Sequence, residues 1–183
     1  FFAKCLVADL VDFINNLLDI RVTSKIPFSD EDVKKIENIK KVDYVVPSKF
    51  VDAVVSVGDS TLVDINGMEL SCRISSLNVS QAKKFTQTGE ADDSYVNRLV
   101  LKDGRYPEKA GECLVDASAV KTYESLGIGS VIRISAEDSA VRDSLKVQEL
   151  TVVGTVDSPM YISTERGSTE AGSGALGYFA YVN

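Results

Sequence analysis

Short runs of β-type residues, separated by turns that contain glycine, dominate the chain after residue 50 and constrain its fold class. Gly58-Asp59 and Asn66-Gly67 are typical of hairpin turns, and Asp103-Gly104 ends another run. A stretch rich in Gly, Ser and Thr over 163–177 predicts a flexible or tightly turned loop. The runs that we predict as strands cover residues 50–57, 61–65, 69–75, 97–102, 113–115, 131–135, 145–156 and 176–182.

The first fifty residues show helical and alternating patterns instead. Residues 2–18 place apolar side chains at helical spacing and predict an amphipathic helix. Ser29 with Asp32 forms a weak capping box that opens a short helix. Alternating runs at 19–24 and 42–46 predict strands on either side of it. Strand, helix and strand in this order predict a βαβ unit, with its strands parallel or separated by one other strand.

Two further helices are predicted in the second half of the chain, so the fold class is α+β. One begins near Val79, and the other is capped by Asp116 or Ser118 and runs to Leu126 before Gly127. The runs on either side of the charged loop 136–144 predict a β-hairpin. We expect three parts: an N-terminal helix and α/β part (1–75), a smaller β-rich part (76–158), and a glycine-rich loop with a returning strand (159–183).

Charge and composition exclude several functions. Acidic side chains number 27 and basic ones 20, so the net charge of −7 leaves no basic face of the kind that nucleic-acid phosphates require. Histidine is absent, which removes the commonest general base and zinc ligand. No run of about eighteen apolar residues is present to cross a bilayer, and the start has no secretory signal pattern. The chain opens on Phe1 without methionine, which predicts a fragment of a longer protein.

The cysteines form no pair with the spacing of a metal site. Cys5, Cys72 and Cys113 are far apart in the sequence, which disfavours zinc. One interpretation is a disulfide between Cys72 and Cys113 with Cys5 left over. The other is three free thiols in apolar surroundings, and this is the interpretation that we favour.

Several patterns match catalytic or binding motifs but lack the context that their chemistry needs. G-x-G-x-x-G over 172–177 follows a polar loop and precedes a strand, whereas a dinucleotide site needs a strand before it and a helix after it. S-x-x-K occurs at 118–121 and 80–83 without the companion motifs of serine acyl-transferases. The acidic clusters at 30–32 and 92–93 form no calcium loop. We therefore predict no catalytic residue, no cofactor, no metal and no enzymatic activity.

One ordered set of motifs remains, and it extends over much of the second half of the chain. It comprises G-R-x-P (Gly104, Arg105, Pro107), G-E (Gly111, Glu112), G-x-x-I at 129–132, V-V-G-x-V around Gly154, Ser-Pro-x-Tyr (Pro159, Tyr161) and Arg-Gly-Ser (Arg166, Gly167). In this order the motifs resemble the extracytoplasmic, MacB-like periplasmic core domain of FtsX-like ABC-transporter permeases. The last two motifs look most like those of the large permeases of Gram-positive bacteria. Residues 18–22 and 28–33 look like the strand and helix that follow the first transmembrane helix in that family.

The resemblance implies a fold, a location and a set of partners. It implies a porter-like βαβ subdomain with a smaller β-rich subdomain inserted, lying outside the cell membrane between the first two transmembrane helices of the permease. The motif residues would then have structural roles. A cytoplasmic ATP-binding subunit would act on the domain through those helices, and a second copy or an extracellular protein would be a further partner. The family completes the porter-like part with a second strand–helix–strand, which we expect to be missing here because the chain stops at Asn183.

Three functions follow as hypotheses. The first is a transporter ectodomain without catalysis, which couples cytoplasmic ATP hydrolysis to substrate export or to signalling outside the membrane. The second is an extracellular module that binds a ligand or peptide without mechanical work, for which an exposed strand edge would be suitable. The third is an enzyme that acts on the cell wall, and the S-x-x-K matches are its only support. The sequence favours the first.

Overall fold

A computed structural model describes residues 16–24, 26–58, 60–64, 66–135, 141, 145–163 and 166–183. Most of the helix predicted over 2–18, including Cys5, lies outside these residues, and so does most of the loop predicted over 136–144. Among the described residues the α-helices are α2 (Asp30–Glu37), α3 (Val79–Thr88) and α4 (Ala117–Thr122). The single-turn 3-10 helices are η1 (Glu124–Leu126) and η2 (Pro159–Tyr161).

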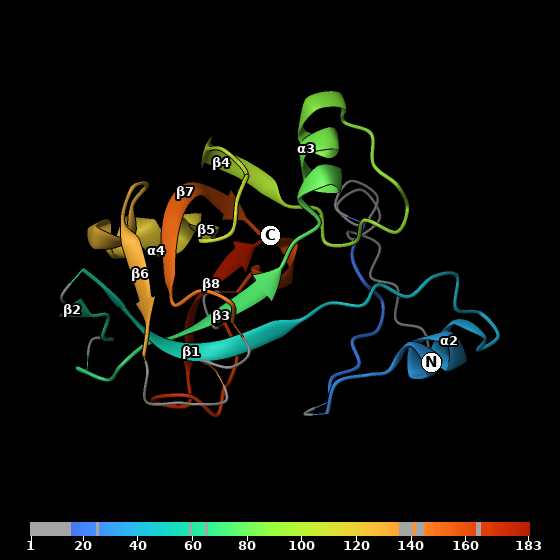
Figure 1. Cartoon of the computed structure of the whole chain (residues 1–183), viewed down its shortest axis with the longest axis horizontal. Coiled ribbons are helices and arrows are strands. Elements are labelled where there is room, and N and C mark those ends of the chain that lie inside the picture. Colours follow the sequence, from blue (N-terminus) through green and yellow to red (C-terminus); the bar gives the residue numbers. More distant parts are fainter. Residues whose placement is uncertain are drawn as a thin grey trace.

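Six strands form a closed ring of hydrogen-bonded neighbours (Figure 1). The strands are β1 (Phe50–Val57), β3 (Ser71–Ser76), β8 (Leu176–Val182), β5 (Glu112–Asp116), β7 (Glu149–Asp157) and β6 (Val131–Ile134), in their order around the ring. β6 closes the ring because it pairs antiparallel with both β7 and β1. The pairs β3–β8 and β5–β7 are parallel, and the others are antiparallel. β2 (Ser60–Thr61) forms a short hairpin with β1, and β4 (Val100–Gly104) pairs with β7 outside the ring.

Alternation of side chains along the strands gives the protein two apolar cores, one inside the ring and one outside it. Tyr178 and Ala180 of β8 are buried in the inner core, whereas Phe179 and Tyr181 of the same strand are buried in the outer one. α4 and η1 contribute Ala119 and Leu126 to the inner core. The outer core lies beneath α3 and the segment that leads into β4, and its members are Ala82, Tyr95, Leu99, Tyr106, Leu114, Val156, Phe179 and Tyr181.

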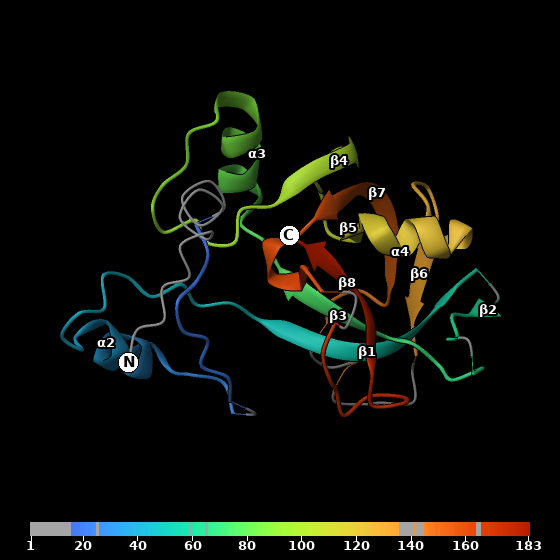
Figure 2. The same cartoon turned by 180° about the vertical axis from the view of Figure 1, so that it is seen from behind.

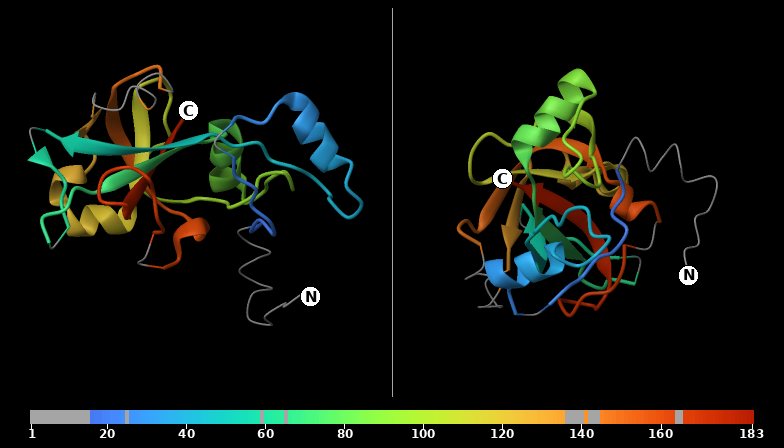
Figure 3. Two further views of the ribbon diagram at one scale, coloured as in Figure 1. Left: turned by 90° about the horizontal axis from the view of Figure 1, so that it is seen from below. Right: turned by 90° about the vertical axis from the view of Figure 1, so that its right-hand side faces the viewer.

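The strands predicted at 19–24 and 42–46 are wrong, and with them the βαβ unit. Both segments are extended chain without strand pairing, on either side of α2 (Figure 2). Ile20 is 81% exposed and Val46 is 42% exposed, and neither segment contributes a residue to the apolar cores of the described chain. Alternation predicts a strand only where a neighbouring backbone is present to pair with it, and no described strand lies beside these segments. Figure 3 shows residues 19–49, which we call the arm, extending away from the ring.

Most of the other local predictions are confirmed. The runs on either side of the 136–144 loop pair as the β6–β7 hairpin, and Gly58 turns β1 into β2 with a φ of 62°. Ser29 and Asp32 form the full capping box of α2. Asp116, rather than Ser118, is the N-cap of α4. That helix ends four residues before Leu126 and is followed by η1, so the predicted single helix is two short ones.

The α+β class is confirmed, but the ring takes strands from all three predicted parts. β1 and β3 come from 1–75, β5, β6 and β7 from 76–158, and β8 from 159–183. The described strands therefore belong to one packing unit that continues across residues 75 and 158. Where domain boundaries lie stays a prediction.

Candidate functional site

The G-R-x-P and G-E motifs meet in one ion pair. Arg105, just after β4, donates from both terminal nitrogens to the two carboxylate oxygens of Glu112, at 2.8 and 2.7 Å. Glu112 is buried at the start of β5 and also accepts the backbone N–H of Glu108 at 2.8 Å. These donors, the Arg105 side chain above all, lower the pKa of Glu112 to about 2. The pair thus ties the β4–β5 connection, which contains Pro107, to the first residue of β5.

Two motif glycines allow the backbone to pass close to itself beside this pair. Gly104 of β4 and Gly154 of β7 are partners in the strand register. A Cβ on Gly154 would lie 2.7 Å from the carbonyl oxygen of Arg105 and 2.9 Å from that of Asp103. Gly104 has a φ of 76°, and a Cβ there would collide with the carbonyl oxygen of Val153. Both positions therefore require glycine, because a backbone neighbour cannot move aside as a flexible side chain can.

The Arg-Gly-Ser motif takes part in a second ion pair, in which both side chains are almost fully buried. Arg166 Nη2 lies 2.8 Å from Oδ2 of Asp116, and the two side chains are 10% and 3% exposed. The Arg166 guanidinium also donates to the carbonyl oxygens of Tyr161 and Ser163 and to the hydroxyl of Ser118. Asp116 in turn accepts the Ser118 N–H at 2.9 Å and so caps α4. One arginine therefore fastens the loop after η2 to the first turn of α4.

A row of aromatic rings and charged side chains extends from this second pair across the outer face of the ring. Tyr161 stacks on Phe179 with 4.5 Å between ring centres. Arg73 donates twice to Asp52, each time at 2.7 Å, and its guanidinium lies 4.6 Å from the centre of the Phe50 ring. Asp52 and Arg73 are cross-strand partners of β1 and β3, and their side chains are 14% and 13% exposed.

The remaining predicted positions shape turns. Gly111 has a φ of 82°, and its carbonyl oxygen accepts the N–H of Thr151 at 2.7 Å. Pro159 is the first residue of η2. Gly167 has a φ of 112°, and its carbonyl oxygen accepts the N–H of Leu176 at 3.0 Å, which closes the loop before β8.

The structure thus gathers the motif residues into two groups at opposite ends of β5. The first group lies around Glu112, the first residue of the strand, and the second around Asp116, the last. The motifs did not point to Asp116, Asp52 or Arg73. A charged residue in the middle of an apolar run is the signal that could have found Arg73, since the β1–β3 hairpin register places Asp52 opposite it.

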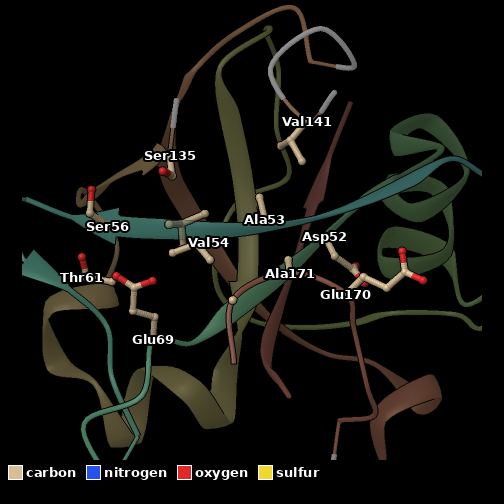
Figure 4. A pocket seen from close by; sticks show the side chains of 12 residues that line it. Asp52, Ala53, Val54, Ser56, Thr61, Glu69, Ser135, Val141, Glu170 and Ala171 are labelled. Carbon is tan, nitrogen blue, oxygen red and sulfur yellow. The ribbon is translucent and has the colours of Figure 1, made fainter. Parts of the chain in front are cut away.

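A groove of about 650 Å³ lies on the β1 side of the molecule (Figure 4). Ala53, Val54 and Val55 of β1 line it, and the loop before β8 borders it through Glu170 and Ala171. Other side chains that line it are Asp52, Ser56, Thr61, Glu69, Ser135 and Val141. Its charged lining is acidic, but the Asp52 carboxylate is already paired with Arg73.

The residues that match enzyme motifs in the sequence have other roles in the structure. Ser118 donates its hydroxyl to Asp116 at 2.6 Å and accepts from Arg166, so this oxygen is engaged at the cap of α4. The G-x-G-x-x-G segment leads into β8, not into a helix. Within the described ranges, no three His, Cys, Asp or Glu side chains lie close enough together to hold a metal ion. Cys72 and Cys113 are free, buried thiols, and burial raises the pKa of Cys113 to about 12 and also raises the pKa of Cys72 well above its ordinary value.

None of the helices in the described part of the chain has the length and apolarity to cross a membrane. No family model matches the chain, and no curated protein matches it. Among solved structures, it is similar to the periplasmic region of MacB from Actinobacillus actinomycetemcomitans, with 14% identity and a TM-score of 0.38 over 82% of this chain. It is also similar to the extracellular domain of the noncanonic ABC-type transporter YknZ from Gram-positive bacteria, with 12% identity and a TM-score of 0.42 over 85% of this chain.

This chain spans 52% of the first of these structures and 62% of the second. The first of these structures is a periplasmic region, and the second is an extracellular domain of an ABC-type transporter. With identities below 15% and TM-scores below 0.5, the likenesses are broad and decide nothing about activity.

Proposed function

We propose that this chain is a non-catalytic extracellular domain of an FtsX-like ABC-transporter permease. In this role it couples cytoplasmic ATP hydrolysis to substrate export, or to signalling, outside the cell membrane. Its partners are the transmembrane helices of the same permease and, through them, an ATP-binding subunit. A second permease copy or an extracellular protein is a further candidate partner.

The observation that carries the proposal is the position of the motif residues. They come from segments between 104 and 167, and they converge on two ion pairs with buried carboxylates, Arg105–Glu112 and Arg166–Asp116, rather than on an open catalytic cleft. Each pair joins a loop to one end of β5, a strand that is paired with β8 on one side and β7 on the other within the closed ring. Such ties favour a body that moves as a unit, which is what a domain moved by helices in the membrane requires.

The arm supports the proposal that this chain is one part of a larger assembly. α2 has no buried residue, and many of the exposed large apolar side chains of the described chain lie between residues 20 and 50. They are Ile20, Val22, Ile26, Phe28, Ile39, Tyr44, Val46 and Phe50. Exposed apolar side chains concentrated in one segment mark a surface that another polypeptide covers. We propose that another polypeptide segment of the assembly covers the arm.

A binding module is the second candidate function, and the groove beside β1 is the observation that favours it. Addition of a peptide strand has less support, because both outer strands have features that hinder pairing. β4 carries a bulge between Leu101 and Asp103 and a charged pair between Lys102 and Asp157, and β2 is only two residues long.

Cross-linking in the full-length protein separates the two functions. Single cysteines replace exposed arm residues such as Ile20, Ile26 or Ile39, in a background without the native thiols, and oxidation joins arms that lie next to each other. We expect the cross-link to lower ATP hydrolysis by the assembled transporter, and reduction of the disulfide to restore it. A cysteine at exposed Lys121 on α4 is the control. Full cross-linking with unchanged hydrolysis would refute the mechanical role, and affinity for a ligand would then favour the binding module.

A further inference from the structure

Asn16 and Asn97 bind each other where the arm leaves the rest of the molecule. The backbone N–H of Asn97 donates to the carbonyl oxygen of Asn16 at 2.8 Å. In return, the side-chain oxygen of Asn97 accepts the backbone N–H of Leu18 at 3.3 Å. The segment 16–18 is thus joined to Asn97 through the Asn97 backbone and its side chain, although 81 positions separate Asn16 from Asn97 in the sequence. We call this pair the clasp.

The Asn16 side chain extends the clasp to two more segments. Its amide nitrogen donates to the carbonyl oxygens of Asp93 at 2.5 Å and Tyr95 at 3.1 Å. Its amide oxygen accepts the hydroxyl of Tyr44 at 3.3 Å. The incoming chain at Asn16, the returning segment of the arm at Tyr44 and the 93–97 loop are therefore held at one point.

Both asparagines have backbone angles that few other residues adopt. Asn16 has a φ of 46° and Asn97 a φ of 52°, in the left-handed region where asparagine is one of the few tolerated residues besides glycine. Asparagine also supplies the amide groups of the clasp, which glycine cannot. The conformation and the hydrogen bonds therefore both favour asparagine at the two positions.

From the clasp, a short stretch of chain leads into the ring. Tyr95 and Leu99, on either side of Asn97, are buried in the outer core at 7% and 2% exposure. The hydroxyl of Tyr95 accepts the N–H of Leu99 at 3.4 Å. The next residue, Val100, begins β4 and pairs with Asp157 of β7. A displacement of Asn16 is thus transferred to groups that are packed against the ring.

We propose that the Asn16–Asn97 clasp is the point through which movement of the chain before residue 16 reaches the ring. This inference rests on the proposed function, since it assumes that the preceding chain leads to the membrane. It assigns Asn97 as a positioning residue for coupling. Removal of its side-chain acceptor should weaken the connection between the ring and the moving segment without damaging the ring itself.

Three substitutions at one position separate the parts of the proposal. Asn97→Ala removes the acceptor and strains the backbone. Asn97→Gly removes the acceptor but adopts the positive φ freely. Asn97→Asp keeps an oxygen acceptor for Leu18 and tolerates the left-handed region. Loss of coupling in the alanine and glycine variants with retention in the aspartate variant is the pattern that the clasp predicts.

The measurement uses the full-length protein with its ATP-hydrolysing subunit in lipid vesicles. A donor dye on a cysteine at exposed Lys121 of α4 and acceptor dyes on the lipid headgroups report the distance of the ring from the bilayer. We compare the nucleotide-free state with the state trapped by ATP and vanadate. In the unsubstituted protein the energy transfer should differ between the two states. Asn97→Gly should reduce that difference by about fivefold. Asn66→Ala, in an exposed turn, should leave it unchanged.

The outcomes separate the clasp from the proposed function. No nucleotide-dependent difference in the unsubstituted protein would overturn the proposed function, and the clasp with it. A difference that Asn97→Gly retains in full would overturn the clasp alone. Hydrogen exchange distinguishes a structural defect: β3 and β8 amides should keep their protection in Asn97→Gly, whereas the Leu18 amide should lose it. Loss of protection throughout the ring would overturn the inference, because Asn97 would then be needed for folding rather than for coupling.

Discussion

Replacement of Arg166 by methionine tests whether the Arg166–Asp116 pair stabilises the fold. The methionine keeps most of the apolar length of the arginine but leaves the Asp116 carboxylate buried without its ion-pair partner. Asp116→Asn removes the charge of the other partner and keeps an oxygen that can accept the Ser118 N–H and cap α4. The two single variants and the double variant form a double-mutant cycle that isolates the charge interaction.

The expected magnitude follows from the geometry. Two unit charges 2.8 Å apart attract each other by about 6 kcal/mol at an effective dielectric constant of about 20. Several kcal/mol of this are offset because both groups lose their hydration, at 10% and 3% exposure. We expect Arg166→Met to lower the free energy of unfolding by about 3 kcal/mol, because it leaves a buried charge unpaired. Asp116→Asn should cost about 2 kcal/mol and the double variant about 3, a coupling energy of about 2 kcal/mol.

Urea unfolding followed by far-ultraviolet circular dichroism measures these energies, since the chain has no tryptophan for fluorescence. Arg133→Met is the control, because Arg133 pairs with Glu149 at 2.9 Å on the surface, where the side chains are 46% and 62% exposed. It should cost below about 1 kcal/mol. A coupling energy between Arg166 and Asp116 below about 0.5 kcal/mol would refute the argument that this pair fastens the loop to α4.

Three further predictions concern other parts of the ring. Gly154→Ala should lower the free energy of unfolding by about 2–3 kcal/mol, because its Cβ would lie 2.7 and 2.9 Å from backbone oxygens. Gly127→Ala is the control and should lower it far less, so equal melting temperatures for the two variants would contradict this prediction. Because the pKa of Glu112 is lowered in the fold, its ionised carboxylate stabilises the fold at pH values above the ordinary pKa of the group, and this stabilisation should be lost as pH falls from about 4.5 towards 2. Melting temperatures measured against pH should show the loss, and the Glu112→Gln variant should not show this pH dependence. Cys72 and Cys113 should resist alkylation at pH 8 in the folded chain and should react once the chain unfolds. Rapid labelling of the native protein would contradict this prediction, because it would show that the thiols are accessible.

The local elements could be predicted because their signals lie within a few residues. The hairpin at Gly58, the capping box at Ser29 and the helix cap at Asp116 were all found in the sequence. The strands at 19–24 and 42–46 could not be judged in this way. Their alternation is genuine, but a strand also needs a neighbouring backbone, and the described chain places none beside them.

The site shows the same division. The sequence singled out Arg105, Glu112 and Arg166 through their motifs, and the structure supplied their contacts. The partner of Arg166, Asp116, was predicted only as a helix cap, since two residues 50 positions apart carry no sign of their pairing in the sequence. The sequence gives no sign of the clasp, because its patterns predict a helix that includes Asn16 and a strand that begins at Asn97, whereas both residues have positive φ angles outside helices and strands.

The sequence by itself determined the α+β class, most of the strands and their turns, and a charge balance unsuited to nucleic acid. The strands and turns follow from the spacing of apolar residues and from turn residues that are neighbours in the sequence, and the charge balance follows from the sum of the charged residues. Only the tertiary structure decided that the strands close into one ring, because β6 must meet β1 and β7 from opposite sides. It also decided that the motif residues form two ion pairs at opposite ends of β5 and that the arm extends away from the ring. Long-range pairing depends on which surfaces remain to be buried once the local elements have formed, and no short stretch of sequence encodes that choice.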